Sequence, residues 1–150
     1  MAKTATAEKH DGHQTQQADA RYTRRIAQFV SGLTYEKIPA EVRQRIKLLI
    51  LDSLGCGMYG ALKEHSQLAT KAIVSVDDSK NCGLWGTNQR VSAPHAALLN
   101  GTYVQGFELD DIHRKGAMHV GSTTLPAIVA LSEVRSGMSG KRFMTAAVAG

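Results

Sequence analysis

Apolar residues recur three and four positions apart along most of the chain, the spacing that places them on one face of a helix. This spacing predicts a first helix from Tyr22, with one buried face and an end at Gly32, and a long second helix with Pro39 in its first turn. A third helix stops at the turn-forming residues 77–79. The apolar positions that mark these helices are Ile26, Phe29, Val30 and Leu33; Val42, Ile46, Leu49 and Ile50; and Ala69, Ala72, Ile73 and Val76.

The second half of the chain predicts two longer helices separated by a polar loop. Ser92 is a good N-cap for a helix that continues through Phe107 and carries three acidic residues at its C-terminal end. Residues 122–124 offer caps for the next helix, which has Pro126 in its first turn and runs to Gly137.

The whole pattern predicts an all-α fold. Ser139 starts a last helix, and the piece from Cys82 to Trp85 is too short to assign. Because the chain stops inside an apolar helical run, we expect residues 22–150 to be the incomplete N-terminal part of a larger helical domain. Gly55, Gly57 and Gly60, at the far end of the second helix, indicate close approach of another backbone or the end of that helix.

Composition narrows the class of protein. With 43% apolar and 21% charged residues the chain is globular. Its net charge of +5 is spread along the sequence and only 5% of residues are aromatic, which argues against a nucleic-acid partner. Its apolar runs are shorter than the roughly 18 residues of a membrane span. The two cysteines lack CxxC spacing, which indicates a reduced, intracellular protein.

The first 21 residues are polar and predict a disordered tail. A mitochondrial presequence would be rich in arginine and poor in acids, whereas this tail holds Glu8, Asp11 and Asp19 before its first arginine. The composition of the tail therefore favours a cytoplasmic location for the protein, with a mitochondrial location as the alternative.

Candidate chemistry concentrates between Glu108 and Gly121, where three carboxylates and two imidazoles fall within one short stretch. Such side chains exchange protons near neutral pH. If the preceding helix persists through residue 111, Glu108 and Asp111 share a face while Asp110 points elsewhere. The N–H groups of residues 121–124, at the start of the next helix, would attract an anion.

Two other interpretations of this stretch stay open. Acids and histidines in a loop are most often a solvated connection. A metal site would draw its ligands from Asp110, Asp111, His113 and His119, but no H-E-x-x-H or Cys/His pattern accompanies them, so no metal is expected.

Three stretches resemble a known family. They are Ile26 to Ala61, with Leu-Leu-Ile-Leu-Asp-Ser-Leu-Gly-Cys; Trp85-Gly-Thr followed by Ala-Pro-His-Ala-Ala-Leu-Leu-Asn-Gly; and Phe-Glu-Leu-Asp-Asp-Ile-His through His119 to Leu-Pro-Ala-Ile-Val-Ala-Leu-Ser-Glu. In order and spacing the sequence is similar to the start of the MmgE/PrpD family, whose members include 2-methylcitrate dehydratase and cis-aconitate decarboxylase.

The resemblance implies a dimeric lyase that acts on small di- or tricarboxylates without a metal or organic cofactor. It also implies an active site between the large helical domain and a smaller α/β domain absent from this chain, so that this segment alone is expected to be inactive. On this basis His119 and Asp110 are the expected catalytic residues. Further residues expected to contact substrate are Glu108, Asp111, His113, Gly121 and Ser122.

The exact reaction depends on finer features of the motif. Family members often have Thr or Tyr where this chain has Ile112, and an isoleucine side chain cannot form hydrogen bonds. The Asp-Asp-x-His motif, and a second histidine followed by Val120 rather than proline, favour the decarboxylase over the methylcitrate dehydratase type. A different class stays open: a non-catalytic helical protein that dimerises through its glycine-rich surface.

Overall fold

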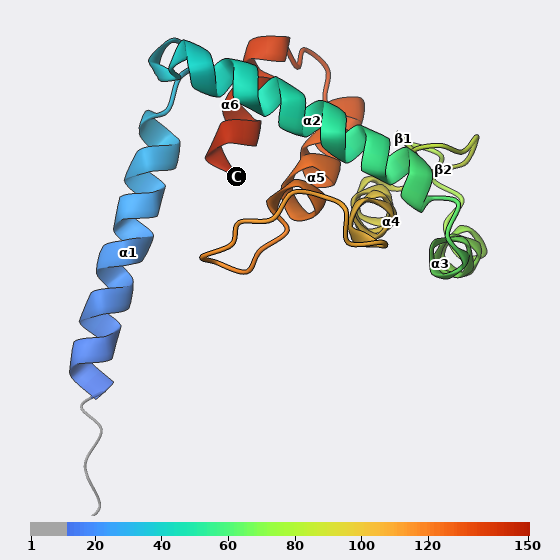
Figure 1. Ribbon diagram of the computed structural model, residues 1–150, viewed down its shortest axis with the longest axis horizontal. Helices are drawn as coiled ribbons and strands as arrows, with labels where there is room; N and C mark the ends of the chain where they lie inside the picture. The colour runs from blue at the N-terminus through green and yellow to red at the C-terminus, as the bar shows by residue number, and fades with distance from the viewer. Residues whose placement is uncertain (1–11) are drawn as a thin grey trace, which may run out of the picture. The chain divides into compact units, whose positions relative to one another are not determined.

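The computed structural model of the protein describes residues 12–150, and the all-α expectation is confirmed within them (Figure 1). The chain divides into two units, at residues 33 and 34. The first unit holds α1 (Gly12–Gly32). The second holds α2 (Ala40–Gly60), α3 (Glu64–Val74), α4 (Ala93–Gln105), α5 (Val120–Val134) and α6 (Gly140–Ala149), with the short 3-10 helix η1 (Tyr35–Lys37).

Helix α1 confirms the first predicted helix but extends it toward the N-terminus. Its start at Gly12 lies inside the segment expected to be a disordered tail, and residues 1–11 of that tail lie outside the described residues. Within this unit taken by itself, the apolar side chains of Tyr22, Ile26, Phe29 and Val30 are exposed by 45% to 63%. The unit alone therefore does not cover the face that the spacing predicted to be buried.

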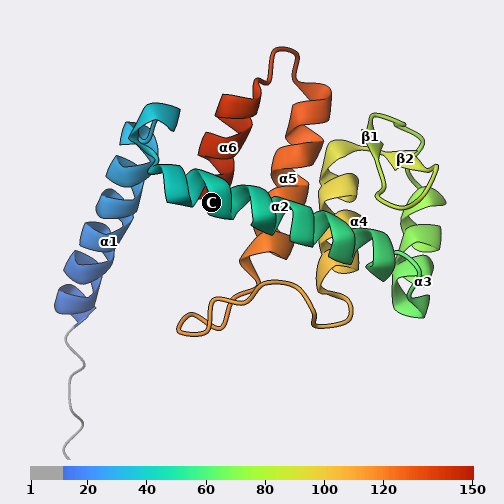
Figure 2. The same cartoon turned by 45° about the horizontal axis from the view of Figure 1, so that its top comes forward.

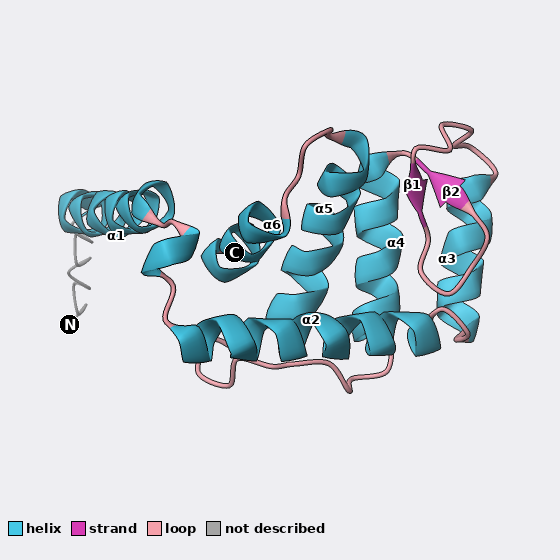
Figure 3. Ribbon diagram, turned by 90° about the horizontal axis from the view of Figure 1, so that it is seen from above, coloured by secondary structure: helices cyan, strands magenta, loops and turns pink. Residues whose placement is uncertain are grey.

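In the second unit, α4 and α5 lie side by side and α2 lies across both of them (Figures 2 and 3). Helix α2 begins directly after Pro39, as predicted. Its glycines mark close contacts: a Cβ atom at Gly60 would lie 1.7 Å from the Tyr103 carbonyl oxygen of α4, and one at Gly57 would lie 2.5 Å from the Trp85 ring. The predicted close approach of another backbone is therefore confirmed at Gly60.

A small hairpin was missed from sequence. Strand β1 (Cys82–Gly83) pairs antiparallel with β2 (Arg90–Val91), and Figure 3 shows both beside α3 and α4. Strands of two residues are too short to show an alternating pattern. Glu133 of α5 holds the hairpin by accepting the Gly83 N–H and pairing with Arg90 at 3.1 Å.

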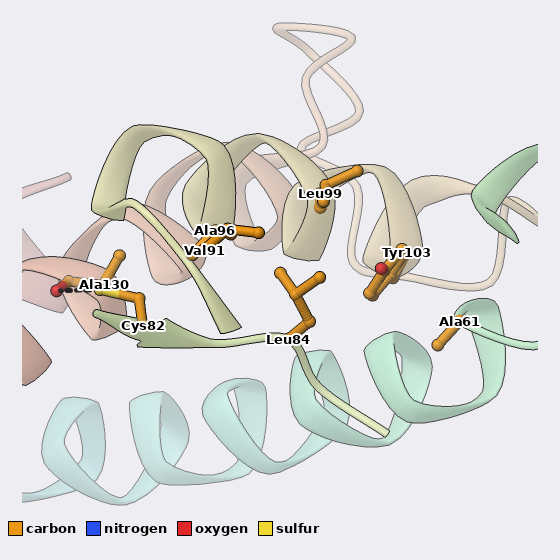
Figure 4. Packing of buried hydrophobic residues seen from close by; sticks show 8 residues of the cluster. All are labelled: Ala61, Cys82, Leu84, Val91, Ala96, Leu99, Tyr103 and Ala130. Carbon is orange, nitrogen blue, oxygen red and sulfur yellow. Dashed lines mark hydrogen bonds between the residues drawn. The ribbon is translucent and has the colours of Figure 1, made fainter. Parts of the chain in front are cut away.

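The hydrophobic core joins this hairpin to the helices. Leu84 and Val91 of the hairpin region are buried against Leu99 and Tyr103 of α4 (Figure 4). The Tyr103 hydroxyl is hydrogen-bonded to Thr70 of α3. None of the described helices is long and apolar enough to cross a membrane.

Helices α5 and α6 begin differently. Ser139 caps α6 as predicted, since its hydroxyl oxygen accepts the Arg142 N–H at 3.3 Å. Helix α5, however, begins at Val120, before the predicted caps at residues 122–124, and Pro126 lies inside it. Because Pro126 has no N–H, the Ser122 carbonyl lacks its usual helical donor. That carbonyl lies against Gly101 of α4, where a Cβ would come within 2.8 Å.

Candidate active site

The candidate residues lie on the loop between α4 and α5, which Figure 2 shows extending from the ends of the two helices. Helix α4 ends at Gln105, so the prediction that it carries the acids at its C-terminal end is wrong. Glu108 has a φ of +58°, in the left-handed region that a helix cannot contain. Glu108 and Asp111 therefore do not form the predicted pair on one helix face.

The loop instead brings Asp110 to His119. The His119 Nδ1 atom lies 3.0 Å from Asp110 Oδ1, and the Asp110 side chain is completely buried. Because a carboxylate oxygen accepts hydrogen bonds, this contact favours the tautomer with the proton on Nδ1, which leaves Nε2 as the second functional nitrogen. The other oxygen of Asp110, Oδ2, is buried and has no hydrogen-bond partner among the described residues.

Glu108 approaches the opposite side of the same ring. Its Oε2 atom lies 3.5 Å from His119 Nε2, and its side chain is 70% exposed. Gln105, the last residue of α4, donates a hydrogen bond to the other Glu108 oxygen. His119 thus has a buried carboxylate near Nδ1 and an exposed carboxylate near Nε2.

Asp111 turns toward the backbone of α5. Its Oδ1 atom accepts the Gly121 N–H at 3.0 Å. Gly121 is buried, and a Cβ there would lie 2.2 Å from Asp111 Oδ1 and 2.5 Å from the Ser53 hydroxyl of α2. At the helix N-terminus predicted to attract an anion, the Gly121 N–H is therefore occupied by a side chain of this chain.

The remaining candidates have contacts of their own. The Ser122 hydroxyl donates to the His119 carbonyl at 3.0 Å and is buried. His113 is exposed: its N–H donates to the Met118 carbonyl at 2.8 Å, and its Nδ1 accepts the Gly116 N–H at 3.0 Å. These contacts fold the loop back on itself, which brings His119 near Asp110, nine residues earlier in the chain.

A cavity of about 980 Å³ lies along the exposed side of α2. Lys63 and Tyr59 stand in its wall, with their Nζ and hydroxyl atoms 3.0 Å apart, and this hydrogen bond lowers the pKa of Tyr59. Burial, followed by the charges of Asp52, Asp110 and Asp111, raises the pKa of the Cys56 thiol. The residues that line the cavity are Leu48, Leu51, Asp52, Gly55, Cys56, Tyr59, Lys63, Phe107 and Leu109.

No pattern in the sequence predicted that Cys56, Tyr59 and Lys63 would line this cavity. Of the three glycines at the far end of α2, only Gly55 lines the cavity, and no other backbone comes close to it. Among the described residues, no group of three or more His, Cys, Asp or Glu side chains is arranged to hold a metal ion.

Comparison with known proteins decides the family. The model of the MmgE/PrpD N-terminal domain matches residues 24–150. The chain belongs to the MmgE/PrpD family. The His119–Asp110 contact, the Asp111–Gly121 contact and the cavity along α2 therefore all lie within an MmgE/PrpD N-terminal domain.

Relatives within the MmgE/PrpD family carry related names. The chain is 38% identical to the cis-aconitate decarboxylase-like protein oryM of Aspergillus oryzae, over 85% of this chain and 28% of that protein. It is 36% identical to a cis-aconitate decarboxylase of Aspergillus terreus, over 75% of this chain and 23% of that protein. It is 30% identical to a human cis-aconitate decarboxylase, over 74% of this chain and 23% of that protein. The chain spans about a quarter of the length of these relatives.

Proposed function

We propose that the His119–Asp110 pair is the acid–base centre of a lyase of the cis-aconitate decarboxylase type, which converts cis-aconitate to itaconate. The observation that supports it most directly is the 3.0 Å contact between His119 Nδ1 and a wholly buried Asp110. The names of the curated relatives support the choice of substrate class.

Asp110 controls the proton on the ring in this proposal. By accepting from Nδ1–H it fixes one tautomer and stabilises the imidazolium form, as a buried carboxylate does in other acid–base pairs. Because both nitrogens of the imidazolium carry protons, Nε2 then becomes the donor toward the open side of the loop. Glu108, 3.5 Å from Nε2, orients that nitrogen and shares its proton.

The proton completes the decarboxylation. The carbon–carbon bond to one carboxylate breaks, carbon dioxide leaves, and the electron pair stays on the substrate with carbanion character. His119 Nε2–H then delivers the proton that quenches this charge, so that one proton is consumed and one carbon dioxide released. General acid catalysis by a positioned side chain contributes about 100- to 10,000-fold to the rate. In this proposal, exposed His113 supplies a polar contact for a substrate carboxylate.

The test is His119→Gln in the full-length protein, assayed for itaconate formation from cis-aconitate. We expect kcat to fall by at least about 100-fold with the fold unchanged by circular dichroism. His65→Gln, the same change at an exposed histidine of α3, is the matched control and should keep near-normal turnover. Near-normal turnover by His119→Gln would contradict the assignment of His119 to the acid–base centre.

Substrate choice is tested in parallel on cis-aconitate and 2-methylcitrate. Formation of itaconate supports the decarboxylase, whereas dehydration of 2-methylcitrate alone would assign the hydro-lyase type. Absence of both activities, with a dimer in solution, would favour a non-catalytic dimerisation module.

We also propose that the full-length protein is a homodimer, that it needs no cofactor and that it is located in the cytoplasm. We further propose that residues 1–150 alone are inactive. Light scattering, fractionation and an assay of the isolated segment check these points.

A further inference from the structure

Two adjacent carboxylates in the loop face different partners. Asp110 Oδ1 lies 3.0 Å from the His119 ring, whereas Asp111 Oδ1 accepts the backbone N–H of Gly121 at 3.0 Å. His119 is the residue directly before α5, and Gly121 is the second residue of that helix. The two contacts therefore hold the same short segment, one by its side chain and one by its backbone.

The backbone at His119 is held from the helix side as well. The hydroxyls of Ser122 and Thr123 both donate to the His119 carbonyl, at 3.0 and 3.2 Å. The position of the His119 ring therefore follows the first turn of α5. Asp111 is the side chain of the loop that ties this turn to the segment carrying Asp110.

Close packing at Gly121 leaves this tie little freedom. A Cβ at Gly121 would lie 2.2 Å from Asp111 Oδ1 and 2.5 Å from Ser53 Oγ, below the 3.0 Å that real Cβ atoms keep. Ser53, on α2, is fully buried. The absence of a side chain at Gly121 thus lets the loop, α2 and α5 meet, and it lets the Asp111 carboxylate reach the N–H.

We infer that Asp111 is a positioning residue that acts through His119, rather than a group that binds substrate. This inference rests on the proposed function of the His119–Asp110 pair. Its carboxylate oxygen accepts the Gly121 N–H and fixes the start of α5, which sets the ring at hydrogen-bond distance from Asp110. A carboxylate is also a poor direct partner for a carboxylate substrate, since like charges repel.

The experiment compares three variants of the full-length protein. Asp111→Ala removes the acceptor, and Asp111→Asn keeps a carbonyl oxygen at the same place. Asp77→Ala is the matched control, because Asp77 accepts the Ser92 N–H at 2.8 Å at the start of α4 and so caps a different helix. Steady-state kinetics on cis-aconitate are measured at a temperature at which all three variants are folded.

We expect Asp111→Ala to lower kcat by about 10- to 100-fold, the size of effect that a small misplacement of a catalytic group produces, with KM changed less than about threefold. Asp111→Asn should restore most of kcat, and Asp77→Ala should leave kcat within about twofold of wild type. A raised KM with normal kcat, or no recovery in Asp111→Asn, would overturn the positioning role in favour of substrate contact or charge.

A second readout does not depend on turnover. Nitrogen-15 spectra of labelled histidines report the tautomer of His119, assigned through His119→Gln. At a pH at which the ring is neutral, wild type should show a single tautomer with the proton on Nδ1, and Asp111→Ala should shift toward the mixture of a free imidazole. If the tautomer shifts but wild type converts no carboxylate, the proposed function fails while the positioning role stands. If wild type is active and Asp111→Ala changes neither tautomer nor kcat, the positioning role fails.

Discussion

Replacing Gly60 by alanine should separate α2 from α4. A Cβ at this position would lie 1.7 Å from the Tyr103 carbonyl oxygen and 2.6 Å from its carbonyl carbon, where real Cβ atoms keep at least 3.0 Å. Both of these atoms belong to the backbone of α4, so no side-chain rotation relieves the clash. The two helices must move apart by more than 1 Å for Gly60→Ala to be accommodated.

The expected cost follows from what that movement disturbs. Tyr103 is fully buried, and its hydroxyl is hydrogen-bonded to Thr70 of α3. Gaps of 0.5 to 1 Å forfeit about a quarter to a half of the dispersion attraction of the atoms involved. Overpacking typically lowers the free energy of unfolding by about 1 to 3 kcal/mol. The higher helix propensity of alanine offsets at most about 1 kcal/mol of this loss. Because the clash is with backbone, we expect Gly60→Ala to lower the free energy of unfolding by about 2 to 4 kcal/mol.

Gly55 provides the matched control on the same helix. Apart from its chain neighbours and the nearby backbone of its own helix, no atom lies within 4 Å of a Cβ built there, so Gly55→Ala should only gain helix propensity, up to about 1 kcal/mol. Urea unfolding followed by far-UV circular dichroism measures both free energies. Equal destabilisation by the two variants, or a Gly60→Ala variant within about 0.5 kcal/mol of wild type, would refute the packing argument.

Three further predictions concern the caps, the loop and the thiols. Hydrogen bonds from the Ser92 hydroxyl, the His95 ring and two backbone N–H groups hold the pKa of Asp77 well below its ordinary value. Its contribution to stability is therefore present above the unfolded pKa of about 4 and lost as the pH falls below it, so urea midpoints of wild type and Asp77→Asn should differ at pH 7 and converge in acid. Gly121→Ala should displace the Asp111 carboxylate and reproduce the kinetic and tautomer changes of Asp111→Ala; wild-type kinetics would show that the close contact is not required. Burial raises the pKa of Cys56, so its alkylation by iodoacetamide in the folded protein at pH 7 should be at least several-fold slower than that of a free thiol, and equal rates would contradict this.

Helical spacing predicted the helices well because each depends on a local pattern. The starts of α2 and α6 followed from Pro39 and Ser139, and the approach of α4 to α2 followed from Gly60. These signals lie within a few residues of the feature they predict.

Helix ends set by distant contacts were predicted poorly. The end of α4 at Gln105 goes with the left-handed backbone at Glu108, and the N–H of Gly121 near the start of α5 is bound by Asp111 from the preceding loop. Such contacts carry no periodic signal in the sequence, and the two-residue strands of the hairpin carry none either.

At the candidate site, too, local patterns were informative and contacts between distant residues were not predicted. The residue types between Glu108 and Gly121 indicated acid–base chemistry, but spacing alone predicted the wrong pair of acids. The pairing of Asp110 with His119 depends on how the loop reverses, through the His113–Met118 bridge and the left-handed backbone at Ala117. That reversal is a property of the folded loop. The resemblance named Asp110 and His119 together, but their direct contact could be seen only in the structure.

The contact of Trp85 with Gly57 gives the molecule an internal optical probe. Trp85 is the single tryptophan of the chain, and its half-buried ring lies where a side chain on Gly57 of α2 would otherwise stand. Its backbone N–H is also bound by Asn100 of α4, at 2.9 Å. In the isolated segment, the wavelength of tryptophan emission therefore reports whether the hairpin, α2 and α4 stay together, without any label.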